Sequence, residues 1–318
     1  MLKSGLSFVL SDLSIEGEVP HQLADGSYFR RAAPNEIEIF QNQLGQILTG
    51  GFYSWPRYNC RVTEEKHGNR TTFHFEELPE EEWRYWVVSY NGNNAFAHKV
   101  QKAALLLETD FDIGLDVMFD ELDQQGKVMG WTGLPLHLID KYSSPDEAQK
   151  NARILNVAEL ETLKELIDLV DNLPDEYDFV EHAFKNFASI RLVPRHSELR
   201  TVGYFAIVEA LITHSPRLTE TLDSISHQIR NKAILVRKRF ARNVEMSSYF
   251  LPAAEEKIWT LLYSYRSCLA HGSKVDFDKK FLVLKNQGAV VAFLQEFLKE
   301  LLKFALREPE FLMDLKRC

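Results

Sequence analysis

The chain has 318 residues, of which 45% are hydrophobic and 26% charged, so it is long enough for two domains of ordinary globular composition. No apolar run is long enough to span a bilayer, no signal-peptide pattern opens the chain, and three widely spaced cysteines provide neither a disulfide framework nor a paired-thiol metal site. The net charge of −9 argues against a general nucleic-acid binder. We therefore expect a cytoplasmic protein without membrane contact and without a cofactor.

The charge is distributed unevenly along the chain. Residues 1–194 hold 17 Lys and Arg against 32 Asp and Glu, whereas residues 195–318 hold 20 against 14. A basic half joined to an acidic half is typical of a domain that contacts a polyanion, linked to an acidic partner domain.

Residues 1–142 predict a β-rich N-terminal domain. Runs of β-forming residues, separated by turns that contain Gly or Asn, favour strands at 36–40, 72–75 and 84–90, with turns at 50–51, 67–70 and 91–93. We expect a barrel or a sandwich. Its aromatic residues leave open a pocket for an unknown ligand or trigger, although most such rings pack in cores.

Residues 143–318 predict an all-α region, which begins at a linker near 142–146. Apolar residues then recur at spacings of three and four, and favour helices at 160–170, 179–190, 222–240 and 289–306. The predicted fold class is α+β, with a β-rich N-terminal domain followed by a helical bundle.

One further helix ends in a cluster of polar side chains. Pro252 suits a helical first turn, and Gly272, just past the last periodic residue, is a natural helix stop. Arg266, Ser267 and His271 therefore lie together at a helix C-terminus.

This arrangement, R-S-x-x-x-H-G after an aromatic-rich helix, resembles the R-x(4–6)-H signature of HEPN domains, many of which are metal-independent ribonucleases. The apolar run 204–213 lies roughly where HEPN proteins have an early helix that carries a polar residue. With Tyr-x-x-Arg-Ser before the His-Gly pair, the chain looks most similar to the ApeA-like branch, which is associated with defence against phage. The resemblance covers about 199–281, in a HEPN-like domain of about 195–318.

The motif residues suit RNA cleavage by the RNA's own 2′-hydroxyl. The unperturbed pKa of histidine, about 6.5, suits His271 for acid/base work near neutral pH. The permanently charged fork of Arg266 fits phosphate oxygens. A helix cap is the alternative role for His271.

Helix geometry complicates this assignment. Residues 266 and 271 lie about 140° apart on a regular helix, whereas Ser267 and His271 share a face. Either the helix loosens near Gly272, or a second protomer completes the site. HEPN proteins are known as dimers with a composite cleft, so the resemblance implies a homodimer. Trp259 and Tyr263 could supply its apolar part, or they could pack within the monomer.

Glu209 is the only charged residue in the apolar run 202–212. We expect it to be buried and to pair with Arg266 or His271, since a buried carboxylate needs a partner. It is either a catalytic residue or one half of a structural ion pair.

A stretch of thirteen residues without an acid carries six cations, which we consider candidates for guiding an RNA backbone. A solvated helix face is the alternative. The six are Arg230, Lys232, Arg237, Lys238, Arg239 and Arg242.

These residues and the resemblance together predict a metal-independent endoribonuclease that acts on RNA as a homodimer, in bacterial abortive infection or as a toxin. The main alternative is a catalytically silent HEPN module that binds RNA or a partner. A more distant alternative is a regulator whose N-terminal domain senses a ligand. Cys268 lies on the core-facing side of its helix, so we expect an inert thiol.

Overall fold

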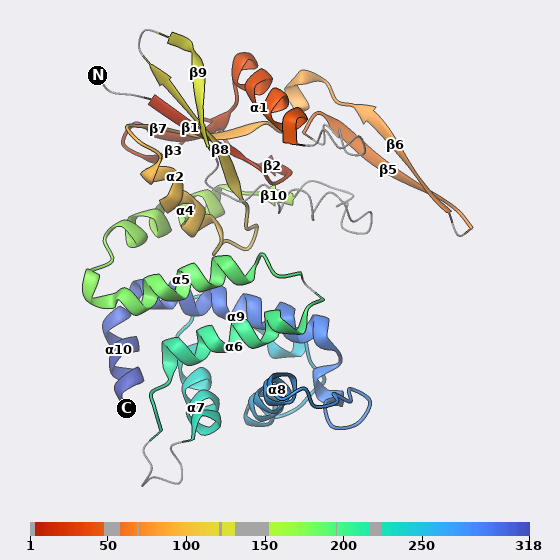
Figure 1. Ribbon diagram of the computed structural model, residues 1–318, viewed down its shortest axis with the longest axis vertical. Coiled ribbons are helices and arrows are strands. Elements are labelled where there is room, and N and C mark those ends of the chain that lie inside the picture. Colours follow the sequence, from red (N-terminus) through yellow and green to blue (C-terminus); the bar gives the residue numbers. More distant parts are fainter. Residues whose placement is uncertain are drawn as a thin grey trace. The chain divides into compact units, whose positions relative to one another are not determined.

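The computed structural model describes residues 4–47, 58–68, 70–120, 123–130, 153–194, 196–216 and 224–318. The chain forms two compact units, Met1–Asp171 and Asn172–Cys318, each with its own internal contacts (Figure 1). The protein is α+β, as expected: a sheet region is followed by a helical region. The expected turn at 50–51 and the expected linker at 142–146 lie outside the described residues.

The N-terminal unit is built on an antiparallel sheet with the strand order β3-β4-β7-β1-β8-β9. Its described elements are β1 (Ser4–Val9), β2 (Leu13–Ile15), β3 (His21–Ala24), β4 (Ser27–Arg31), α1 (Pro34–Ile47), β5 (Cys60–His67), β6 (Arg70–Glu77), β7 (Trp86–Asn91), α2 (Ala95–Ala104), β8 (Ile113–Asp120), β9 (Asp123–Gly130), β10 (Arg153–Leu155) and α4 (Val157–Asp171). Among these elements, the sheet ends in two different strands, β3 and β9, and helices pack against it. The expectation of a barrel or a sandwich was therefore wrong.

Two of the three expected strands are confirmed. The strand at 72–75 is part of β6, which pairs with β5 in a hairpin whose turn contains Gly68 at φ +62°. Positive φ is a conformation that glycine adopts without steric cost. The strand at 84–90 corresponds to β7, which lies inside the sheet between β4 and β1.

The third expected strand, at 36–40, is instead part of helix α1, which begins at Pro34. The Glu36 carboxylate accepts a hydrogen bond from the Ala33 backbone N–H at 2.7 Å, which caps the first turn. Phe40 is 1% exposed and stacks on Phe8 of β1, with ring centroids 4.5 Å apart. Alternating Ile and Glu residues predicted a strand, but packing of Phe40 on the sheet favours the helix.

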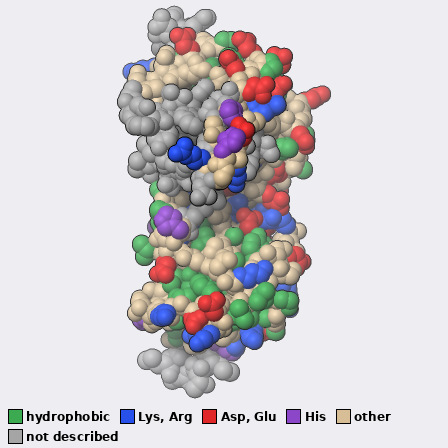
Figure 2. All heavy atoms as spheres, turned by 90° about the vertical axis from the view of Figure 1, so that its right-hand side faces the viewer, with side chains coloured by type: hydrophobic (Ala, Val, Ile, Leu, Met, Phe, Trp, Pro, Cys, Tyr) green, Lys and Arg blue, Asp and Glu red, His purple; other side chains and the backbone are tan. Residues whose placement is uncertain are grey.

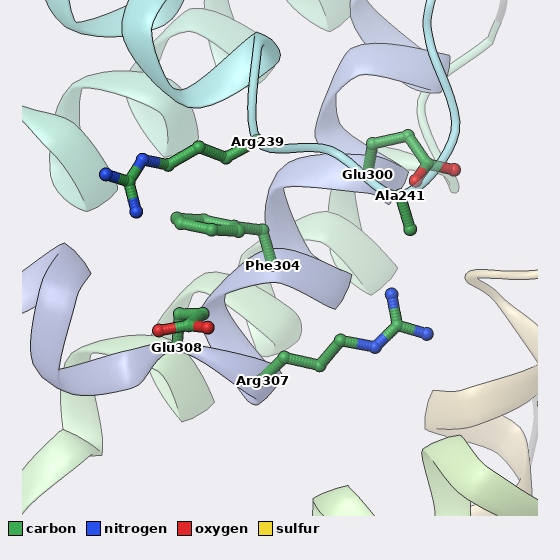
Figure 3. A pocket seen from close by; sticks show the side chains of 6 residues that line it. All are labelled: Arg239, Ala241, Glu300, Phe304, Arg307 and Glu308. Atoms are coloured by element: carbon green, nitrogen blue, oxygen red, sulfur yellow. The ribbon is translucent and has the colours of Figure 1, made fainter.

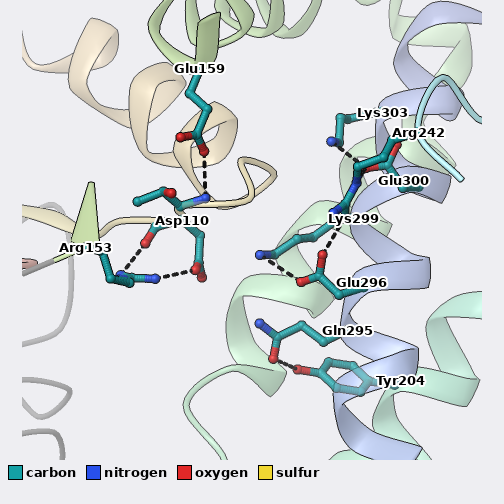
Figure 4. Close-up of polar contacts among 11 residues, drawn as sticks. Asp110, Arg153, Glu159, Tyr204, Arg242, Gln295, Glu296, Lys299, Glu300 and Lys303 are labelled. Carbon is teal, nitrogen blue, oxygen red and sulfur yellow. Dashed lines mark hydrogen bonds and ion pairs between the residues drawn. The ribbon is translucent and has the colours of Figure 1, made fainter. Parts of the chain in front are cut away.

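The first unit extends to Asp171, beyond the boundary expected near 142. Strand β10 pairs in parallel with β2, and Arg153 of β10 forms an ion pair with Asp110 at 2.9 Å (Figure 4). Glu159 of α4 accepts a hydrogen bond from the Thr109 backbone N–H at 2.7 Å. Helix α4, which we expected in the second domain, therefore belongs to the first.

The C-terminal unit is a bundle of helices around α9. Its described α-helices are α5 (Asp178–Ile190), α6 (Glu198–Ile212), α7 (Ile225–Arg237), α8 (Glu255–Ala270), α9 (Gln287–Arg307) and α10 (Pro309–Arg317). Helix α9 packs against α5, α6, α7 and α10 (Figure 1), and α8 packs against α6 and α7. The expected helices are confirmed to within a few residues at most ends, whereas α10 was not predicted.

Aromatic rings fix α8 against α9. Trp259 is 0% exposed, and its ring lies 5.8 Å and 4.9 Å from the ring centroids of Phe293 and Phe297 on α9. Near the other end of α8, Tyr265 packs edge-on against Phe281, with centroids 5.6 Å apart. Trp259 is thus a core residue, and the idea that it lies in a dimer interface was wrong.

A network of charged side chains lines α9 (Figure 4). Arg242 lies 2.5 Å from Glu296 and 3.1 Å from Glu300, and Lys303 lies 2.6 Å from Glu300. Lys299 adds an ion pair of 3.2 Å with Glu296. Since Glu300 is only 2% exposed, its charge depends on these cations for compensation.

Candidate functional site

The C-terminus of α8 closes as the sequence predicts. His271 is the C-cap, and Gly272 adopts φ +65°. The Gly272 N–H donates to the Leu269 carbonyl at 3.2 Å, and the Ser273 N–H to the Cys268 carbonyl at 2.8 Å. These two bonds form a Schellman motif, which satisfies carbonyls that the helix leaves free. The helix is regular as far as Ala270.

Arg266 lies in the last turns of α8 and pairs with Glu209 of α6. The guanidinium nitrogen is 3.1 Å from one carboxylate oxygen and 3.2 Å from the other. The guanidinium carbon also lies 5.7 Å from the ring centroid of Tyr263, which packs edge-on against Phe205. Arg266 is thereby held in one place by a carboxylate and an aromatic ring.

The expected partnership between Glu209 and the helix of Arg266 is confirmed, but Glu209 is less buried than expected. The Glu209 side chain is 22% exposed and that of Arg266 25%. Helix α6 is apolar in sequence almost all round, yet Ala206 and Ala210 face solvent in the same part of the helix. Glu209 therefore lies at the edge of the core, where a ligand can reach its ion-pair partner Arg266.

Burial changes the acidity of two groups at this site. It raises the pKa of Glu209 above its ordinary value, and the positive charge of Arg266 offsets part of that rise. Burial also raises the pKa of Tyr263; the negative charge of Glu209 adds to this rise and Arg266 opposes it. The Arg266 Nε and one Glu209 oxygen are buried without a hydrogen bond of good geometry. The ion pair thus leaves hydrogen-bonding capacity for a further group.

The stability that the protonated Glu209 carboxyl contributes should decrease as the pH rises above 4.5, the ordinary pKa of a glutamate carboxyl. Because the pKa is raised by folding, the folded protein keeps the proton at pH values at which the unfolded chain has lost it. The contribution is fully present below the unfolded pKa and is lost as the pH rises through the folded pKa. Urea unfolding at a series of pH values should show a shallower decline for Glu209→Gln than for the native protein.

The control for this pH series is Glu256→Gln, which removes an exposed carboxylate from the surface of α8. Its stability profile should run parallel to that of the native protein. If the Glu209→Gln profile runs parallel as well, the raised pKa is contradicted.

His271 and Ser267 are not brought onto the Arg266–Glu209 pair. His271 is exposed, and its backbone N–H donates to the Ser267 carbonyl at 3.1 Å. Ser267 is partly buried one residue after Arg266. Because the helix stays regular, the divergence of about 140° between residues 266 and 271 persists within one chain. The structure therefore unites two of the four candidate catalytic residues.

Three of the six cations proposed to guide RNA are held within the protein. Arg237 forms a bidentate pair with Glu255 of α8 at 2.7 and 2.8 Å, and this hydrogen bonding raises its pKa further. Arg242 belongs to the α9 network, and Lys232 is buried, 3.3 Å from the His214 ring. Although the stretch contains no acid, acids from other helices reach it. Arg237, Arg242 and Lys232 are therefore engaged by side chains of the protein itself, which leaves them less available to an RNA backbone.

The other three cations remain candidates. Arg230 contacts the His227 ring at 2.7 Å and is partly buried, whereas Lys238 and Arg239 are exposed. Figure 2 shows basic and acidic side chains interspersed on the face that it displays.

Sequence reasoning missed four exposed lysines in the segment that follows His271. They lie before α9, where Asp276 uses its carboxylate locally by accepting hydrogen bonds from the Asp278 and Lys279 backbone N–H groups at 3.0 and 3.1 Å. Four lysines within twelve residues after the His-Gly pair were a visible signal. The lysines are Lys274, Lys279, Lys280 and Lys285.

Cys268 is partly exposed, which corrects the expectation of a buried thiol. Its sulfur lies 3.9 Å from the ammonium of Lys280. Helix α8 turns this position toward the following loop and not into the bundle core.

Comparisons with protein-family models, with curated proteins and with solved structures found no match. In the described part of the chain, no three His, Cys, Asp or Glu side chains are grouped so that they could hold a metal ion. None of the described helices combines the length and the apolar character that a membrane span requires.

Proposed function

We propose that this protein is a metal-independent endoribonuclease of HEPN type, with a role in bacterial defence against phage or as a toxin. The observation that carries the proposal is the position of Arg266. Its guanidinium is fixed by Glu209 and Tyr263, its side chain is 25% exposed, and it lies about one turn from an exposed histidine. The resemblance of the 266–272 motif to HEPN domains supports the same reading.

The chemistry divides between these side chains. The 2′-hydroxyl of RNA attacks the adjacent phosphorus, and the bond from phosphorus to the 5′-oxygen breaks. His271 accepts the 2′-hydroxyl proton, and the imidazolium that forms returns that proton, through water, to the leaving 5′-oxygen. Arg266 stabilises the negative charge that builds up on the non-bridging oxygens. Glu209 orients Arg266, and the four lysines after His271 attract the RNA backbone.

The divergence of Arg266 and His271 leads us to propose a homodimer. Two copies of α8 related by a two-fold axis would place the arginine of one protomer near the histidine of the other. Dimers of this symmetry are the commonest soluble oligomers. Trp259 and Tyr263 were both considered for the apolar part of such an interface. Because Trp259 is buried, only the partly exposed Tyr263 of these two remains available to it.

RNA cleavage should survive EDTA and should leave 2′,3′-cyclic phosphate and 5′-hydroxyl ends. The expectation follows from the proposed chemistry, in which a histidine and an arginine do the work that a bound metal ion does in other nucleases. End-labelled RNA, incubated with the purified protein, would show both the resistance to EDTA and the nature of the ends. Loss of activity in EDTA, with recovery on adding Mg²⁺, or 5′-phosphate ends would contradict the mechanism.

One observation favours a second candidate function, a module that binds RNA or a protein partner without cleaving it. The carboxylate of Glu209 already pairs with Arg266 and reduces its net charge. In that case Glu209→Gln would strengthen RNA binding, because it frees the cation, and no cleavage would appear. Under the ribonuclease proposal the same substitution lowers the cleavage rate, since Arg266 loses its orientation.

A further inference from the structure

A pocket of about 300 Å³ lies in the C-terminal unit (Figure 3), and Arg266 is not one of the residues that line it. It is formed where the segment after α7 passes the C-terminal half of α9 and the start of α10. Its volume is at the lower end of the range for small-molecule sites. The lining residues are Arg239, Ala241, Glu300, Phe304, Arg307 and Glu308.

Arg239 is the residue best prepared to bind a ligand. Its guanidinium carbon lies 4.2 Å from the ring centroid of Phe311 on α10, so one face of the guanidinium is held against an aromatic ring. Among the described residues, no acceptor or carboxylate bonds to the Arg239 side chain, and the residue is exposed. Stacking restricts the plane of the fork while its N–H groups stay available, which is how arginine recognises phosphate and carboxylate groups.

The charges around the pocket favour an anion. Glu300 lines it, but Arg242 and Lys303 at 3.1 and 2.6 Å compensate its carboxylate. Arg307, in the last turn of α9, and Arg239 lie on opposite sides of the Phe304 ring in Figure 3, and Glu308 is the remaining carboxylate. Because Glu300 is already paired, the exposed guanidinium of Arg239, which stacks on Phe311, is the cation that favours an anion here. Phe304 and Ala241 add an apolar surface between the charged groups.

We propose that this pocket binds a small phosphate ester of about the size of a nucleotide. The phosphate accepts hydrogen bonds from the fork of Arg239, and the organic part of the ligand lies over Phe304 toward Arg307. The pocket is separate from the proposed cleavage site. Arg237 pairs with Glu255 in the first turn of α8, and Arg266 lies eleven residues further along that helix, which is about 16 Å of helical rise. The inference therefore stands whether or not the protein cleaves RNA.

The test measures binding to the full-length protein with four probes: 5′-AMP, ribose 5-phosphate, adenosine and inorganic phosphate. Calorimetry, supported by the ligand-induced rise in thermal stability, reports affinity for each. We expect 5′-AMP and ribose 5-phosphate to bind, 5′-AMP more tightly, and adenosine to bind much more weakly than either. Binding of inorganic phosphate alone, or of adenosine as tightly as 5′-AMP, would overturn the proposal, because the first shows a simple anion site and the second shows recognition without phosphate.

Two substitutions at Arg239 and a control at the neighbouring Lys238 distinguish binding by the planar guanidinium from binding by positive charge alone. Arg239→Gln should weaken 5′-AMP binding about tenfold or more, and Arg239→Lys, which keeps the charge but not the planar fork, should also weaken it. Lys238→Gln removes the same charge from the adjacent exposed residue and should leave affinity unchanged. Equal losses in Lys238→Gln and Arg239→Gln would contradict the site.

Folding and RNA binding are checked in the same variants. Arg239→Lys should retain the thermal stability of the native protein without ligand, so that its loss of affinity reports on the fork itself. Single-stranded RNA that competes with 5′-AMP in native protein, and loses its own affinity in Arg239→Gln, would show an RNA contact and not a small-molecule site.

Discussion

Replacing Arg266 with alanine should slow RNA cleavage by about 100- to 1,000-fold, the effect of removing one fixed donor from a charged transition state. Arg266 is the cation of the candidate site that the fold holds most firmly, by the carboxylate of Glu209 and the ring of Tyr263. The measurement is single-turnover cleavage of an end-labelled RNA. Arg266→Lys keeps the charge without the fork and should recover only part of the rate.

A structural role for Arg266 would produce a different pattern. Removing the guanidinium leaves Glu209 partly buried without its cation, so Arg266→Ala should also lose some stability. The double substitution Arg266→Ala with Glu209→Gln removes the uncompensated charge and should recover stability without recovering cleavage. Lys257→Ala, on an exposed position of the same helix, should change neither property. Cleavage that returns together with stability in the double variant would show that the pair only holds two helices together.

A mixing experiment tests the shared site. Arg266→Ala and His271→Ala proteins, each expected to cleave slowly alone, should regain part of the native rate when their subunits exchange. A mixed dimer carries one intact arginine and one intact histidine in its cleft. Sedimentation before and after mixing is the control that tests whether dimers are present. Exchange without any return of activity would contradict a cleft made by two protomers.

Local signals in the sequence were sufficient for the end of α8. The apolar spacing and Gly272 are read within one short stretch, and Gly272 has the positive φ that a glycine stop requires. The helix start expected at Pro252 was wrong, because α8 begins at Glu255 after an extended Ala254. The pairing of Glu209 with Arg266 could also be predicted from the sequence, since a single carboxylate in an apolar helix needs a cation nearby. In both cases the reason lies in the residues themselves.

Features that depend on residues far apart in the sequence could not be predicted from local signals. The alternation of Glu36 to Phe40 is typical of a strand, and only the contact of Phe40 with Phe8 on the sheet explains the helix. Arg237 and Arg242 looked available because their own stretch has no acid, yet the carboxylates that pair with them come from α8 and α9. The same holds for the pocket beside Arg239, whose lining comes from two segments, 239–241 and 300–308, that are far apart in the sequence.

Trp259→Ala should cost about 3–5 kcal/mol of unfolding free energy, the usual range for truncating a fully buried aromatic residue. Trp259 is 0% exposed and lies against Phe293 and Phe297, so alanine would leave a cavity between α8 and α9. Urea unfolding followed by circular dichroism measures the loss. Because the same contacts set the position of Arg266, cleavage should fall in this variant even at temperatures at which it remains folded.

The size of the Trp259 effect depends on the cavity and not on the indole N–H. That N–H is buried and makes no hydrogen bond to any described residue. Trp259→Phe, which keeps most of the ring and removes the unsatisfied donor, should therefore cost much less than Trp259→Ala. Leu282→Ala, at a leucine that is 51% exposed, provides a control for loss of apolar surface outside the core and should change stability by less than about 0.5 kcal/mol. If Trp259→Ala instead loses no more than Leu282→Ala and weakens dimer formation, the ring lies at a protomer interface, and the packing of α8 on α9 does not depend on it.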